Sequence, residues 1–328
     1  MTPVRRRRVF IVVLVVAATI VLASTEGPAI LLTWTYGGVL LAGFVAFVAQ
    51  GLFAPKPADV PTPVEPVELS EEDKAAVREI AVRTNRPYLA LTPHRQTTGL
   101  LDSKIGGVPY LPPGFPYPHA TSGDGRPLRL LCQLNFGTLP RLAGFPSDGI
   151  LQFYIGGDEY GLDLDRPTTQ DRWRVVFHPG PVGQASPSVP PPPLTDDADL
   201  PFSAEYVLTA TPGVMPITPE DFGWDEFLAG LPRQTPVSCA LGDPGRSRLE
   251  YTLAEATRST GSRIGGYPYF TQSDPRPGTY EAYTVLLLQI DSEADIMWGD
   301  VGVAGWFITP DALARRDFST VLYNWDCV

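Results

Sequence analysis

A repeat within the chain constrains its fold more than any other feature. Three segments recur in the same order, and the first pair agrees at six of nine positions, with Lys104 exchanged for Arg263. The paired segments are 103–111 with 262–270, 131–135 with 287–291, and 152–155 with 305–308. Two copies at this period do not make a solenoid, which needs at least three repeats. We therefore predict one domain of two related halves, roughly 88–178 and 205–328.

Proline and glycine set the fold class. The 328 residues include 36 prolines and 31 glycines, and proline inside a helix removes a hydrogen bond and clashes with the preceding turn. A hydrophobic content of 44% excludes global disorder. We expect an α+β domain dominated by strands. The predicted helices are 70–84, 218–230 and 309–316, and the predicted strands are 128–136, 149–155, 172–177, 205–210, 283–291, 305–308 and 320–325.

The first 54 residues predict a membrane segment. Four arginines precede an apolar stretch at 9–23, and a second apolar stretch covers 29–53. About 20 apolar residues cross the hydrocarbon core, so the second stretch is long enough and the first is marginal. The first stretch is either one helix of a hairpin or a signal peptide cut near Ala23. Both alternatives return the chain to the cytoplasmic side of the cell membrane, with residues 9–53 contacting lipid.

Composition sets the remaining boundaries and excludes one class of partner. Residues 55–68 form a proline-rich linker, and residues 69–328 hold the globular domain. Beyond residue 60 the chain has 20 Lys and Arg against 34 Asp and Glu, and such an acidic domain repels nucleic-acid phosphates. Three cysteines without a CxxC motif indicate reduced thiols rather than a disulfide framework, which also favours the cytoplasm.

Two Gly-Gly turns are the first candidate ligand site. Successive backbone N–H groups beside a cation can bind an anion, although a turn that the fold needs twice is the simpler interpretation. The candidates are Lys104, Gly106, Gly107, Arg263, Gly265 and Gly266. Two cations near one cleft repel each other. We therefore expect Lys104 and Arg263 to be partly buried and each paired with an acidic group, with a bound anion as the alternative.

A run of carboxylates is the second candidate. Asp291, Glu293 and Asp295 alternate, so an extended segment presents them on one face. Asp300 follows in a Trp-Gly-Asp-Val-Gly turn, where we expect it to cap backbone N–H groups. Such a run could hold a divalent ion, but solvated loop charge is the simpler interpretation. We predict neither a metal site nor a cofactor, and we add Asp291 and Asp300 to the candidate ligand-binding residues.

Several motifs together resemble a known family. They are the 103–109 turn, the Gln133 and Gln289 strands, the segment 149–153, the Met-Trp-Gly-Asp-Val-Gly turn at 297–302, and the terminal Trp-Asp-Cys at 325–327. In this order they look like the YwqG-like family, a bacterial domain of unknown function, over about 70–328. The resemblance implies an α+β domain with an internal duplication. It implies no reaction, cofactor or catalytic residue, while the toxin–immunity contexts of some members point to protein binding.

The sequence therefore favours binding over catalysis. Nucleophile-elbow, zincin, P-loop and dinucleotide-binding motifs are absent from the sequence, and each of the three histidines adjoins a proline in a predicted loop. We predict a membrane-tethered, cytoplasmic-facing domain that binds a protein or other ligand, most simply a protein partner. The alternative is a metal-assisted hydrolase that uses Asp291, Asp295 or Asp300, and catalytic residues are otherwise unassigned.

Overall fold

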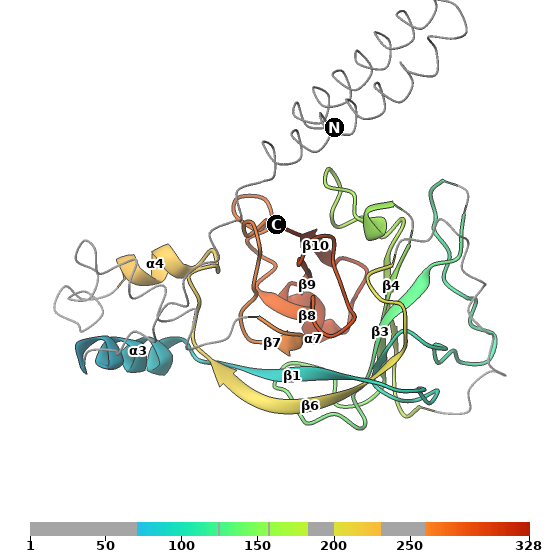
Figure 1. Cartoon of the computed structure of the whole chain (residues 1–328), viewed down its shortest axis with the longest axis horizontal. Helices are drawn as coiled ribbons and strands as arrows, with labels where there is room; N and C mark the ends of the chain where they lie inside the picture. The colour runs from blue at the N-terminus through green and yellow to red at the C-terminus, as the bar shows by residue number, and fades with distance from the viewer. Residues whose placement is uncertain (1–70, 124, 157, 183–199, 231–259) are drawn as a thin grey trace, which may run out of the picture. The chain divides into compact units, whose positions relative to one another are not determined.

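The computed structural model describes residues 71–328, apart from 124, 157, 183–199 and 231–259 (Figure 1). The described residues form a strand-dominated fold with one antiparallel sheet of ten strands, in the order β10-β9-β8-β7-β1-β6-β2-β3-β4-β5. This confirms the strand-dominated class. In this part of the chain no helix is long and apolar enough to cross a membrane. The predicted membrane segment and linker lie outside the described residues.

The strands are short except for the two central ones. The strands are β1 Arg86–Arg95, β2 Lys104–Ile105, β3 Arg129–Asn135, β4 Ile150–Ile155, β5 Arg174–His178, β6 Tyr206–Met215, β7 Arg263–Gly265, β8 Val285–Asp291, β9 Val303–Ile308 and β10 Leu322–Asp326. The helices are α3 Glu71–Thr84, the 3-10 helix η1 Asp158–Gly161, α4 Trp224–Ala229 and α7 Pro310–Arg315.

The sheet repeats one pattern of pairing on each side of its centre. The long strands β1 and β6 run antiparallel side by side over their whole length (Figure 1). Next to β6 lie β2, β3, β4 and β5, which we call the first flank together with β6. Next to β1 lie β7, β8, β9 and β10, which we call the second flank together with β1. The strand β1 precedes β2 in the chain but pairs with β7, and β6 precedes β7 in the chain but pairs with β2. Each central strand therefore belongs to the flank formed by the other half of the chain.

The two flanks also share their register. Lys104 of β2 faces Gln133 of β3, and Arg263 of β7 faces Gln289 of β8. The β3–β4 and β8–β9 pairs each contain one irregularity, which lies directly after Leu130 in one and Leu286 in the other. The offset between those two positions is the same 156 residues that separates Gln133 from Gln289.

Aromatic side chains from both flanks share one core. The Trp306 and Tyr323 rings of the second flank stack with centroids 4.5 Å apart, and Phe153 of the first flank lies 5.5 Å from Trp306. Trp173 lies 5.3 Å from Tyr323. All four side chains are fully buried, and burial of such large apolar surfaces is the main force that holds the two flanks together.

Proline within the central strands is the main departure from expectation. Pro87 and Pro93 lie in β1, which the sequence analysis does not predict as a strand. Leu91 of β1 donates its N–H to Ser262, so the odd-numbered residues of β1 face the β7 side. Both prolines are odd-numbered, and their missing N–H groups point beyond the two ends of the three-residue strand β7. A central strand therefore tolerates them, because no ladder bond is lost there.

Two of the three helix predictions are confirmed. α3 and α7 lie where proposed, and Thr309 caps α7 by accepting the Ala312 N–H at 3.2 Å. The predicted helix 218–230 is wrong in its first half, since α4 begins only at Trp224. The buried Thr218 hydroxyl is without a hydrogen-bond partner in the described residues, so it does not cap a helix. Asp221, which lies within the predicted helix, instead forms an ion pair with Arg276.

Candidate functional site

The two predicted cations occupy equivalent positions beneath separate loops. Their neighbours Ile105 and Ile264 point into the shared core, so Lys104 and Arg263 project from the opposite face of the sheet. Lys104 is 0% exposed and Arg263 is 3% exposed. The strands β6 and β1 separate β2 from β7, which amounts to three strand spacings, or about 14 Å. The structure therefore does not bring the two cations into one site.

Lys104 is held by backbone carbonyls. Its Nζ donates to the carbonyl oxygens of Gly99 at 2.7 Å and Val108 at 2.5 Å. Burial lowers the pKa of Lys104 to about 8, an effect opposed by the negative charges of Asp102 and Glu205. The expected burial is thus present, and the side chain's direct contacts fasten the loops before and after β2 rather than a ligand.

Arg263 is held by a backbone carbonyl and a methionine sulfur. Its guanidinium donates to the Thr260 carbonyl and to Met215 Sδ at 3.0 Å. It also lies 5.5 Å from the centroid of the Tyr88 ring. Burial lowers the pKa of Arg263, whereas Tyr88 and nearby carboxylates raise it. This side chain, like Lys104, fastens the loop that precedes its own strand.

The Gly-Gly turns are required by the backbone. Gly106, Gly107, Gly265 and Gly266 all have φ between 68° and 73°, the left-handed region that favours glycine. The Gly106 N–H donates to the Leu131 carbonyl at 3.0 Å, and the Gly266 N–H donates to the Pro87 carbonyl at 3.0 Å. Since these N–H groups are used within the fold, the geometry favours a structural turn over an anion-binding nest.

Asp291 and Glu293 fasten the start of β7. Asp291 Oδ2 accepts the Gly261 N–H at 2.5 Å, and its Oδ1 accepts the Ser292 N–H at 2.8 Å. Glu293 accepts from both the backbone N–H and the hydroxyl of Ser262, and burial raises the pKa of Glu293. These carboxylates are therefore occupied by hydrogen bonds to the protein.

The remaining predicted carboxylates lie apart. Asp295 forms an exposed ion pair with Arg95 at 2.8 Å. Asp300 is exposed, and its carbonyl accepts the Val328 N–H at 3.1 Å. Among the residues that the structure describes, no group of three or more His, Cys, Asp or Glu is placed to hold a metal ion. No observation therefore favours the metal-assisted hydrolase.

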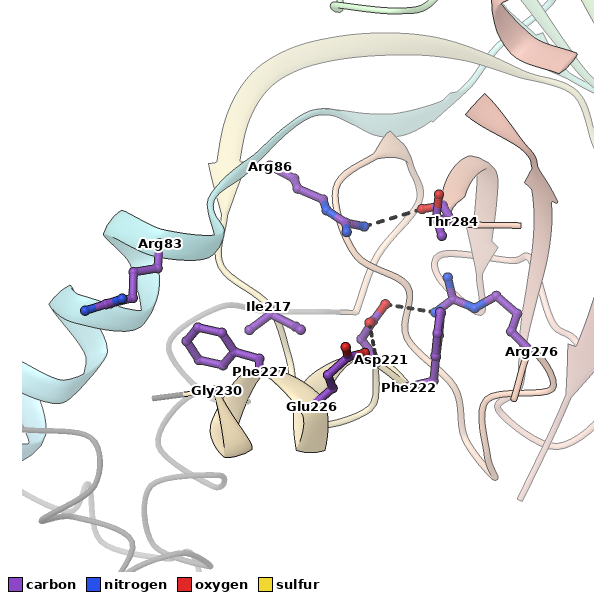
Figure 2. A pocket seen from close by; sticks show the side chains of 11 residues that line it. Arg83, Arg86, Ile217, Asp221, Phe222, Glu226, Phe227, Gly230, Arg276 and Thr284 are labelled. Carbon is purple, nitrogen blue, oxygen red and sulfur yellow. Dashed lines mark hydrogen bonds and ion pairs between the residues drawn. The ribbon is translucent and has the colours of Figure 1, made fainter. Parts of the chain in front are cut away.

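A hollow of the described domain lies away from these residues, between the end of α3, α4 and the loop before β8. It is a groove of about 510 Å³, and Figure 2 shows its side chains. We call it the α3–α4 groove. Its lining residues are Arg83, Arg86, Ile217, Asp221, Phe222, Gly223, Glu226, Phe227, Gly230, Arg276 and Thr284. None of them is predicted from the sequence as a site residue.

A buried ion-pair network forms one wall of the α3–α4 groove. Arg276 is 1% exposed, and its Nη2 lies 2.8 Å from Asp221 and 2.6 Å from Asp274. The Arg276 guanidinium also lies over the Phe222 ring at 4.7 Å and the Phe307 ring at 4.8 Å from the centroids. Two carboxylates and two ring faces saturate this cation, so it builds the wall rather than receiving a ligand.

Arg86 is placed differently. Its guanidinium lies 4.1 Å from the Tyr267 ring centroid and donates to the Thr284 carbonyl at 3.4 Å, a long hydrogen bond (Figure 2). It has no ion pair among the described residues. A guanidinium has five N–H donors in a planar fork, so most of them stay free to face the groove.

Local sequence patterns could not reveal this site. Arg86 and Tyr267 are 181 residues apart in the chain, and Asp221 and Arg276 are 55 apart. The available signal was the isolated Asp-Pro-Arg-Pro-Gly run at 274–278, where a charged pair lies among prolines. The sheet order, which places β7 beside β1, brings Arg86 and Tyr267 together.

Comparison with protein families identifies a match. A family model described as a domain of unknown function (DUF1963) matches residues 103–327. No curated protein matches the chain significantly. The match covers the strands from β2 to β10, but it begins after α3 and β1, which supply Arg83 and Arg86 of the α3–α4 groove.

Proposed function

We propose that this chain, which belongs to the family described as a domain of unknown function (DUF1963), is a binding domain whose partner occupies the α3–α4 groove. The observation that carries the proposal is Arg86, a cation with free donors beside apolar walls in a groove of about 510 Å³. Concave, partly apolar sites with a few polar groups are where proteins commonly bind ligands.

The second part of the proposal is a membrane tether. The apolar stretches 9–23 and 29–53 support it, as do the four arginines before them, which favour a cytoplasmic domain. A proline-rich linker at 55–68 would hold the domain off the bilayer. Confinement to the membrane raises the local concentration of a membrane-borne protein partner, which suits a binding domain better than a diffusible enzyme.

We further propose that the two flanks descend from one duplicated unit whose first strands are exchanged. The equal pairings of Lys104 with Gln133 and of Arg263 with Gln289 support this. At the centre of the sheet Thr92 faces Thr209, and the pairings outward from them mirror each other. The paired segments in the sequence have the same order and close to the same spacing.

Site-specific photo-crosslinking of the full chain in its native membrane tests the binding role. A photoreactive phenylalanine analogue at Phe227, inside the groove, should give one discrete adduct. The same analogue at Leu164, which is 79% exposed and is not part of the groove lining, serves as the control. Equal adducts at both positions, or no adduct at position 227, would contradict the proposal.

The tether is tested separately by chemical labelling. An Ala58→Cys variant, made in a chain whose native cysteines are changed to Ser, is treated in intact cells with a membrane-impermeant thiol reagent. We expect no labelling until the cells are permeabilised. Labelling in intact cells would show that the linker lies outside, and a chain that is fully released from membranes without detergent would remove the tether.

A further inference from the structure

We propose that Arg86 receives a carboxylate that belongs to an extended peptide segment of the partner and lies next to apolar side chains. This inference rests on the proposed binding role of the α3–α4 groove and names the chemistry that fills it. The carboxylate has two sources in a peptide, the chain end or an acidic side chain, and both present the same pair of acceptor oxygens.

The geometry of Arg86 carries the argument. Tyr267 covers one face of the guanidinium, and the Tyr267 hydroxyl is itself fixed by donating to the Thr84 carbonyl at 2.8 Å. The Arg86 guanidinium is therefore held against a ring that is itself fixed. Its free donors form a planar fork that matches the two oxygens of a carboxylate, and such charge-assisted pairs are among the strongest hydrogen bonds in proteins.

The other charges of the groove leave Arg86 as the receptor. Arg83 is neutralised by Glu79, at 3.0 Å, and in Figure 2 its side chain points away from Arg86. Arg276 is neutralised by Asp221 and a second carboxylate. Glu226 is exposed on α4, where water screens its charge, and it is the lining carboxylate that opposes an anionic ligand.

The apolar walls specify what accompanies the carboxylate. Ile217, Phe222 and Phe227 line the groove beside the cation. A bare anion would leave these side chains facing water, whereas apolar side chains next to the carboxylate would cover them. A volume of about 510 Å³ accommodates a few peptide residues, and this favours a peptide segment over an inorganic anion.

Calorimetric titration of the full chain in detergent micelles with three peptides tests the proposal. All share an acetylated Ser-Gly-Ser start and a Leu-Phe end. The first has Gly before Leu-Phe and a free terminal carboxylate. The second has Glu there and an amidated end. The third has Gln and an amidated end, and so it lacks a carboxylate. We expect the first or the second to bind at least about tenfold more tightly than the third.

Variants of the groove assign the effect to Arg86. Arg86→Gln should abolish the preference for the carboxylate, and Arg86→Lys should retain part of it, since a single ammonium keeps the charge without the fork. Arg83→Gln is the matched control and should change affinity less than twofold. Glu226→Gln should tighten binding about twofold, because it removes the opposing charge. Thermal unfolding within a few degrees of the wild type shows that each variant is folded.

The outcomes separate this inference from the proposed function. If the third peptide binds as well as the others, or if both Arg86 variants keep the preference, the carboxylate inference is wrong. An adduct at position 227 would in that case leave the binding role intact. If no adduct forms at position 227 and none of the peptides binds, both proposals fail.

Discussion

The two flanks of the sheet hold their loops with the same side-chain hydrogen bonds, but the side chains around these bonds differ. In the first flank Gln133 Oε1 accepts the Tyr110 N–H at 2.9 Å, and in the second Gln289 Oε1 accepts the Tyr269 N–H at 2.9 Å. Ser103 and Ser262 likewise accept equivalent backbone N–H groups at 3.0 and 3.2 Å. The shared part is therefore the set of buried amides and hydroxyls that satisfy loop backbone.

The flanks differ in one side chain, at the position where their loops offer different backbone N–H groups. At the end of β5 stands His178, and Asp326 takes the equivalent place on β10. Asp326 accepts the N–H groups of Thr271 and Gln272. The matching residues of the first flank are prolines 112 and 113, which have no N–H to offer. A carboxylate is therefore needed only in the second flank, while His178 packs against aromatic rings instead.

Removing the shared amides should give the largest effect. Gln133 bonds to the Leu100 and Asp102 carbonyls besides Tyr110, so Gln133→Ala orphans several buried groups. We expect Gln133→Ala and Gln289→Ala each to lower the free energy of unfolding by about 3 kcal/mol, measured in urea. Gln96→Ala, at an exposed position, should cost less than about 0.5 kcal/mol. If only one of these two substitutions lowered the free energy of unfolding by this much, the two glutamines would not have equivalent roles in the two flanks.

The Gly-Gly turns provide the next largest effect. A Cβ at Gly107 would collide with the Thr98 hydroxyl, and one at Gly266 would lie 2.7 Å from Met215 Sδ. We expect Gly107→Ala and Gly266→Ala each to cost about 2 kcal/mol in the same urea titrations. Gly278→Ala, with φ of 81° and open space around it, reports the backbone strain alone and should cost about 1 kcal/mol. Costs no greater than at Gly278 would mean that the turns are not tightly packed.

Much of this comparison was visible in the sequence. Alternation and turn residues predicted the positions of β3, β4, β5, β8, β9 and β10 within a few residues, and Thr-Pro predicted α7. The repeat motifs predicted that Lys104 and Arg263 would occupy like positions, and the register bears this out. Such features are readable because they depend on local backbone preferences.

The features that the sequence did not predict depend on pairing between segments far apart in the chain. The strands β2 and β7 contain two and three residues, too few for a pattern, and β1 contains two prolines whose tolerance depends on where β7 ends. The shared-site idea for Lys104 and Arg263 assumed that like turns face one cleft, whereas two central strands separate them. The α3–α4 groove was missed because its residues come from distant segments.

Acidification should sharpen the difference between the flanks. Burial lowers the pKa of His178 to about 4, and its Nε2 lies 3.0 Å from Gln152 Oε1. Between pH 6.5 and 4 the unfolded chain binds a proton that the folded chain refuses, so stability falls as the pH falls. The wild type should lose about 2 kcal/mol relative to His178→Gln between pH 7 and 4.5. Parallel pH profiles for the wild type and His178→Gln would mean that burial does not disfavour the protonated imidazole.

Alkaline conditions test the smallest difference, that between the two cations. Burial lowers the pKa of Lys104 to about 8, below its usual value of 10.5, so the folded chain releases this proton before the unfolded chain does. Stability should therefore rise with pH above 8 relative to Lys104→Met, by about 1 kcal/mol between pH 8 and 9 in urea titrations. Arg263→Met should show no such pH-dependent difference, because a guanidinium stays protonated throughout this range. Parallel pH profiles for Lys104→Met and the wild type would mean that the ammonium suffers no net penalty beneath its loop.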